Sequence, residues 1–131
     1  MANTTLNEVF ADTKGLALVT GAIVGAGTSA PTTRLTNPPG WTAARTSEGI
    51  YRISFADDYS RLLSGYGSIG GTTPANVAAH TWVWDDYVTR SGSTLAYREV
   101  SIYDAANALD DLEVTEFFEF TFFFQTTSVI R

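Results

Sequence analysis

The sequence predicts an all-β fold, a single-domain β-sandwich or jelly-roll-like barrel of about seven strands. Turn-forming residues interrupt apolar stretches roughly every ten residues along the chain, which is the spacing of strands in such folds. Serine, threonine and aromatic residues are abundant whereas lysine occurs once, a balance typical of sheets. The run from 112 to 125 is rich in phenylalanine and alternates as a strand does. We expect an N-terminal arm over residues 1–15 and one β-sandwich domain over residues 16–131.

The arm carries a small apolar stripe made of Leu6, Val9 and Phe10. Thr5 followed three residues later by Glu8 is compatible with a capped helical turn, and an extended arm is the alternative. We favour the extended arm and expect its apolar residues to contact neighbouring subunits.

The next elements are predicted from turn chemistry and alternation. Leu16 to Val24 is expected to form a strand, and residues 25–31 a loop. Asn37-Pro38-Pro39-Gly40 predicts a turn, because consecutive prolines cannot continue a sheet ladder. Strands over 41–46 and 50–56 then flank a hairpin loop. In the second strand Tyr51, Ile53 and Phe55 alternate with polar residues, which predicts one buried face.

The segment after this hairpin changes period. Tyr59, Leu62 and Leu63 have the spacing of a helix, so a short helical turn is expected near residues 57–63. The glycines that follow, between residues 65 and 71, are expected to form a loop around a short strand at most. The chain should continue with strands over 81–89 and 95–103 and with a polar connection over 104–111.

The run from 112 to 125 is predicted to be a strand in the core. Alternation places one set of side chains on the buried face, interrupted by Glu116. The reverse face carries Phe117 and Phe123, which is more apolar than a solvated sheet surface. We therefore expect a second packing layer on that face, from the same chain or from another subunit. The residues expected on the buried face are Leu112, Val114, Phe118, Phe120, Phe122 and Phe124.

Charge and hydropathy disfavour two kinds of partner. The net charge of −6 argues against nucleic acid, whose binding depends on lysine and arginine. The weakly polar stretch from Gly15 to Gly27 is too short and too rich in glycine to span a membrane. We therefore predict neither a nucleic-acid nor a membrane partner.

The sequence predicts no cofactor and no enzymatic activity. Residues 20–27 match the Thr-Gly-x-x-x-Gly-x-Gly pattern of short-chain dehydrogenases, but Pro31 and the residues around it are poor helix formers. The glycines are better interpreted as bends and close backbone approaches within a sheet. His80 is the only histidine, so metal sites that need two histidines are excluded.

Two further possibilities stay open. The acidic connection from Asp104 to Asp111 supplies oxygen ligands for a structural calcium ion, although its spacing does not match that of the helix–loop–helix calcium loop. Trp82 and Trp84 fall on one strand face, where they would either pack in a core or stack on a sugar.

The stretch from Trp41 to Leu63, WTAARTSEGIYRISFADDYSRLL, resembles a recurring unit in small head proteins of tailed bacteriophages. In that unit a hairpin strand of the form Gly-x-Tyr-x-Ile-x-Phe/Leu leads into Asp-x-Tyr-x-x-Leu-Leu. The long β run that closes on Ser128-Val129-Ile130 is similar as well. The glycine-rich segment near Gly65 departs from the pattern.

The resemblance implies a capsid decoration, or cement, protein. Such a protein binds the outer surface of the virion and bridges subunits of the major capsid protein, often as a homotrimer. The apolar residues of the arm, together with Phe117 and Phe123, are the expected interface. The alternatives are a head-fibre, neck or tail component, or a carbohydrate-binding β-sandwich that uses Trp82 and Trp84 in adsorption.

Overall fold

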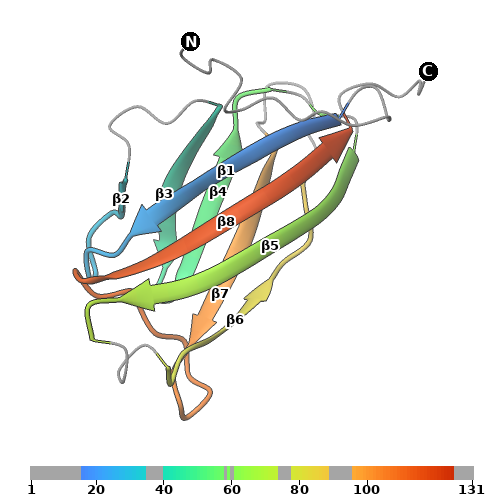
Figure 1. The fold of residues 1–131 in the computed structure, drawn as a ribbon. Helices are drawn as coiled ribbons and strands as arrows, with labels where there is room; N and C mark the ends of the chain where they lie inside the picture. The colour runs from blue at the N-terminus through green and yellow to red at the C-terminus, as the bar shows by residue number, and fades with distance from the viewer. Residues whose placement is uncertain are drawn as a thin grey trace.

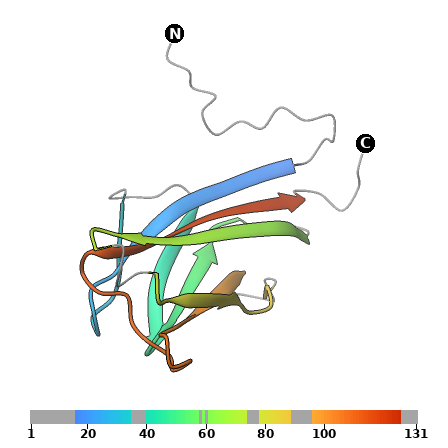
Figure 2. The same ribbon diagram turned by 60° about the horizontal axis from the view of Figure 1, so that its bottom comes forward.

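The computed structural model describes residues 16–34, 40–57, 59, 61–73, 78–88 and 96–125. Its two four-stranded antiparallel sheets pack face to face as a sandwich (Figures 1 and 2), and the described residues contain no helix, which confirms the all-β prediction. The strand order is β2-β1-β8-β5 in one sheet, the β8 sheet, and β3-β4-β7-β6 in the other, the β7 sheet. The strands are β1 Leu16–Val24, β2 Thr32–Thr33, β3 Trp41–Ser47, β4 Ile50–Phe55, β5 Arg61–Gly71, β6 Thr81–Trp84, β7 Tyr97–Tyr103 and β8 Glu116–Gln125.

The core lies where the inward faces of β8 and β4 meet. Along β4, Tyr51, Ile53 and Phe55 are fully buried and alternate with partly exposed residues, as the sequence predicts. The ring of Phe55 meets those of Phe122 and Phe124 edge to face, with centroid distances of 5.4 and 4.9 Å. Such pairs add to the stabilisation that comes from burying apolar area. The alternating phenylalanines of β8 are therefore the centre of the core.

The start of β8 departs from the predicted alternation. Val114 is 69% exposed, so its assignment to the buried face is wrong. The strand begins only at Glu116, whose backbone N–H donates to the Glu113 carbonyl, while the Glu113 N–H donates to the Glu116 carboxylate. These bonds close a turn, and a turn does not keep the two-residue period on which the prediction depended.

The predicted helical turn near residues 57–63 and the glycine loop after it are also wrong. Residues 61–71 form the eleven-residue strand β5, which pairs with β8 over its length. The register shifts between Leu62 and Ser64, so Leu63 is the extra residue of a β-bulge and is exposed. The bulge interrupts the two-residue alternation of the strand. As a result Leu62 and Leu63 follow Tyr59 at the spacing of a helix.

Glycine in β5 is explained by the rings of the neighbouring strand. A Cβ atom on Gly67 would lie 2.4 Å from the Phe118 ring, and one on Gly65 would lie 2.8 Å from the Phe122 ring. Real side chains do not approach so closely, so these positions exclude larger residues. The glycines make room for the core rather than marking a loop.

The remaining elements lie at the positions that the sequence predicts, but some of them differ from the prediction in length. The hairpin of β3 and β4 and the polar connection over 104–111 form as expected, but β6 ends at Trp84 and β7 begins at Tyr97. Among the residues that the structure describes, the very short β2 brings the number of strands to eight. The arm over residues 1–15 lies outside the described residues, so its prediction is untested.

Candidate interaction surface

The outward face of the β8 sheet carries the partly exposed apolar side chains that the sequence indicated. Register partners in antiparallel strands point to the same side of a sheet. Leu18 of β1 is the partner of Phe123, and Val24 is the partner of Phe117, so these four residues face away from the core. The structure thus places Phe117 and Phe123 on the predicted reverse face.

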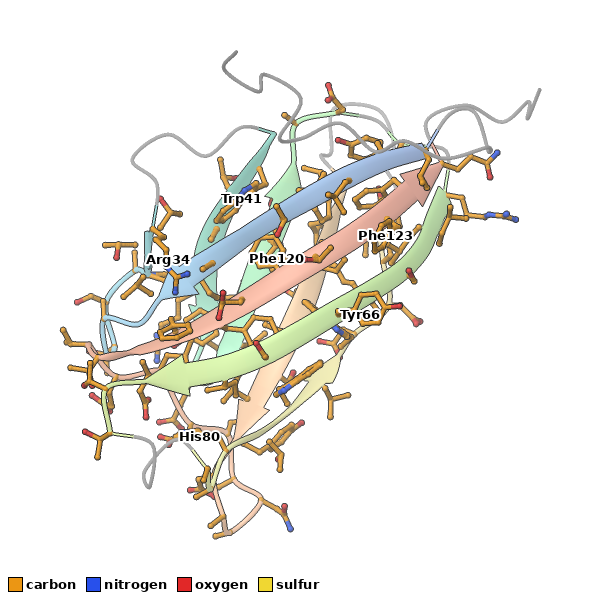
Figure 3. All side chains as sticks on the ribbon, viewed as in Figure 1. Arg34, Trp41, Tyr66, His80, Phe120 and Phe123 are labelled. Atoms are coloured by element: carbon orange, nitrogen blue, oxygen red, sulfur yellow. The ribbon has the colours of Figure 1, made fainter. Side chains whose placement is uncertain are left out.

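One end of this face forms an apolar cluster, which we call the Phe123 cluster. Tyr66 of β5 is 63% exposed, and its ring meets the Phe123 ring edge to face at 6.2 Å (Figure 3). Leu16 and Leu18 extend the cluster across β8, because they lie on the same side of β1. The Phe123 cluster comprises Leu16, Leu18, Tyr66 and Phe123, which lie on three adjacent strands.

The other end of the face is covered by a charged side chain. The guanidinium of Arg34 lies 4.7 Å from the centre of the Phe117 ring and also pairs with the Glu119 carboxylate at 3.4 Å. Both charged side chains are about half exposed, at 52% and 47%, so the ion pair adds little stability. Phe117 is therefore less available to a partner than Phe123.

Between these ends the face is polar. The hydroxyl of Thr20 donates to the Phe120 carbonyl and lies 3.1 Å from the Thr121 hydroxyl. An apolar cluster beside polar and charged groups is the usual composition of a protein–protein interface. No described strand packs over this face, and the predicted arm residues Leu6, Val9 and Phe10 lie outside the described part of the chain.

Trp82 and Trp84 lie on the inward face of β6. Their register partners, Ile102 and Val100, are fully buried. The Trp82 ring meets the Phe118 ring edge to face at 5.3 Å, and the Trp84 ring lies 4.9 Å from that of Phe122. The two indoles thus cover the end of the core and do not form a flat platform.

Trp82 also reaches a groove between the edges of the two sheets. The groove has a volume of about 500 Å³ and is lined by residues 67–71 of β5 together with Ala78, His80 and Trp82. We call it the β5–β6 groove.

His80 joins two carboxylates that lie far from it in the sequence. Its Nε2 atom lies 3.1 Å from an Asp110 oxygen, and its Nδ1 atom lies 4.0 Å from a Glu116 oxygen. The imidazole is 8% exposed and the Glu116 carboxylate 6%. Because the carboxylates approach opposite ring nitrogens, one metal ion cannot bind all three groups. This cluster connects the chain before β6 to the start of β8.

The acidic connection over 104–111 uses its carboxylates locally. Asp104 accepts hydrogen bonds from the backbone N–H groups of Ala106 and Ala108, which is turn chemistry. Asp111 instead binds Arg45. Within the part of the chain that the structure describes, no group of three or more acidic or histidine residues is arranged to hold a metal ion.

The glycines of the dehydrogenase-like motif are explained by packing. A Cβ atom on Gly21 would lie 2.2 Å from the indole of Trp41. The backbone N–H of Gly25 donates to the Glu116 carbonyl, and a Cβ atom there would overlap the backbone of Leu112. The interpretation as close approaches is confirmed for Gly21 and Gly25, whereas Gly27 has a φ of 61° and lies at a bend of the chain.

Comparison with known proteins adds no relative. No family model, no curated protein and no solved structure matches the chain. In the described residues, no helix is long and apolar enough to cross a membrane.

Proposed function

We propose that this chain is a virion structural protein, a decoration or cement protein that binds the outside of a tailed-phage head. It acts as a homotrimer that bridges neighbouring subunits of the major capsid protein, and it has no catalytic role. The resemblance of residues 41–63 to small phage head proteins supports this proposal from the sequence.

The observation that carries the proposal is the Phe123 cluster. A rigid sandwich presents Tyr66 and Phe123 together on an open sheet face, next to hydrogen-bonding groups of Thr20 and Thr121. Aromatic residues on a rigid scaffold are typical anchors of interfaces because they bury much area at little entropic cost. The face thus has the composition and shape of a surface that contacts other subunits.

A cement protein needs only such surfaces. Each copy that spans a joint between capsid subunits adds contact area that must be broken before the shell opens. Because many copies act on one shell, individually weak contacts sum to a large barrier. The net charge of −6 keeps free copies soluble and is compatible with a basic or mixed capsid surface.

Cryo-electron microscopy of purified particles of the phage that encodes the chain tests this function. We expect ordered density of the sandwich over joints between capsid subunits. Particles that lack the protein should open at a lower temperature than complete particles, and adding the purified protein back should restore the difference. Absence of the protein from the particles, or its presence only inside the head, would contradict the proposal.

A carbohydrate-binding role in adsorption is the second candidate. The position of Trp82 among the residues that line the β5–β6 groove favours it, because aromatic rings can stack on the apolar faces of sugar rings. A glycan array would show specific binding that is lost in Trp82→Ala and kept in Val83→Ala, whose side chain is exposed on the same strand. Copies that project from the particle, rather than covering joints, would agree with this role.

A further inference from the structure

The outer edge of β5 has the features of a strand-docking site. β5 is the last strand of the β8 sheet, so within the described residues only β8 pairs with it. Half of the backbone N–H and C=O groups of an edge strand face outward, unpaired. Natural proteins block long edges with lysine, proline, several charges or β-bulges. In β5 the one charged residue, Arg61, and the bulge at Leu63 both lie near its start, and the stretch from Ser64 to Gly71 has no charge, proline or bulge.

The β5–β6 groove lies directly beside this edge. Residues 67–71 of β5 form one wall of the groove, and Ala78, His80 and Trp82 form the rest. Figure 1 shows β5 and β6 on the same side of the sandwich. A strand added to β5 would therefore cover the groove, and every second side chain of that strand would point into it.

We propose that residues 1–15 of a neighbouring copy add to this edge as an extended strand and place the side chains of Leu6 and Phe10 in the β5–β6 groove. This inference rests on the proposed function, because it requires that copies of the chain assemble. The inference specifies which surface the arm contacts. Neither the resemblance nor the Phe123 cluster determines that surface.

The position and the length of the segment support this occupant. Leu16, where β1 begins, is the register partner of Gln125, and Gln125 is the partner of Arg61, so the arm starts at the end of the sheet where β5 begins. Fifteen extended residues span about 50 Å. The eleven residues of β5 span about 36 Å. The arm is thus long enough to pair along the whole edge.

The direction of β1 indicates a neighbouring copy. A straight continuation of β1 before Leu16 leads beyond the end of its own sheet and away from its own groove, whereas docking in the same copy requires a sharp reversal. Leu6, Glu8 and Phe10 share one side of an extended segment, so the two apolar side chains would face the groove with the Glu8 carboxylate between them.

Engineered disulfides test the docking in the full-length chain, which has no cysteine of its own. Ser68→Cys, exposed on β5, would be combined in separate variants with Asn7→Cys, Val9→Cys or Ala11→Cys and oxidised. At least one pair should give covalent species of two or more chains on non-reducing gels. The control pairs the same arm cysteines with Val83→Cys on the outward face of the β7 sheet and should give none. A disulfide within one chain, or no disulfide in any pair, would overturn the inference.

A shortened chain separates this inference from the proposed function. A variant that lacks residues 2–12 should lose the trimer in light scattering, and a synthetic peptide of residues 1–15 should bind to it saturably. If the shortened chain stays trimeric and does not bind the peptide, the arm does not dock on β5. The decoration function would then be tested only by the cryo-electron microscopy of the particles. Binding of a sugar in the groove of the intact chain would likewise exclude the arm as its occupant.

Discussion

Asp111 links the β3–β4 hairpin to the connection before β8 through one carboxylate. Arg45 of β3 donates two hydrogen bonds to it, each of 2.8 Å, and the backbone N–H of Gly49 donates a third of the same length. The hydrogen bonds from Arg45 are the main reason that the pKa of Asp111 lies below its ordinary value of 3.8. The β3–β4 hairpin is thereby tied to the connection that precedes β8.

This network predicts how acid destabilises the protein. Because the pKa of Asp111 is lower in the folded chain than in the unfolded chain, its stabilising effect is complete above pH 4 or so and is lost as the pH falls through the folded-state pKa. Asp111→Asn should lower the melting temperature by roughly 5–10 °C at neutral pH and weaken its dependence on pH below 4. Thermal unfolding from pH 2 to pH 7 measures both effects. Glu113→Gln, at an exposed carboxylate, is the control, and an equal loss there would contradict the assignment.

Tyr51 gives a second test at this scale. Its ring is fully buried, its hydroxyl oxygen accepts a hydrogen bond of 2.8 Å from the Leu112 N–H, and burial raises its pKa to about 12. Tyr51→Phe keeps the ring but leaves that buried N–H unpaired, which should cost about 1–3 kcal/mol in urea unfolding. Tyr66→Phe removes an exposed hydroxyl and should change little. Equal stability of the two variants would show that the Tyr51 bond contributes nothing.

Alternation in the sequence was enough to place Tyr51 on a buried face, since it depends only on neighbouring residues. The pairing of Arg45 with Asp111 was beyond prediction, because 66 residues separate the two and the topology alone brings them together. The same holds for His80 and Asp110, which are 30 residues apart.

At the scale of elements, β5 shows where local rules fail. The strands β1 and β4 and the hairpin loop follow from alternation and turn residues, and they form where expected. In β5 the glycines are dictated by phenylalanine rings on β8, and the bulge at Leu63 disturbs the period. Neither cause is visible within the segment itself, so its helix and loop assignments were wrong.

A single methyl group tests this explanation of β5. Gly67→Ala would place its Cβ atom against Phe118 and should destabilise the fold by about 1–3 kcal/mol through overpacking. Ser68→Ala, at the exposed neighbouring position, is the matched control and should be nearly neutral. Chemical unfolding of both variants provides the comparison. A neutral Gly67→Ala would mean that the strand does not lie as closely on Phe118 as described.

At the scale of the whole molecule, the sandwich presents the Phe123 cluster on an open sheet face, and we propose this cluster as the assembly surface. The sequence predicted that Phe117 and Phe123 share a face and that this face needs cover. It did not reveal that Arg34 covers Phe117 while Tyr66 extends the surface around Phe123, because both contacts come from other strands. The alternation of β8 thus identified the face, and the sheet order determines which part of it is open.

Removing the aromatic groups of this surface should separate the subunits. A variant with both Tyr66→Ser and Phe123→Ser should dissociate at concentrations at least tenfold higher than the unaltered chain, since aromatic anchors typically contribute 2 kcal/mol or more. Val83→Ser removes an apolar side chain that is 55% exposed on the outward face of the β7 sheet and serves as control. Sedimentation velocity over a dilution series measures the change. Equal dissociation of all three proteins would place the interface elsewhere.

The mass of the unaltered chain in solution is the most direct test of assembly through this face. Light scattering on the eluting protein should give three times the 14.2 kDa mass of one chain, falling toward a single chain in the Tyr66→Ser, Phe123→Ser variant. A mass of 14.2 kDa for the unaltered chain at every concentration would contradict the account.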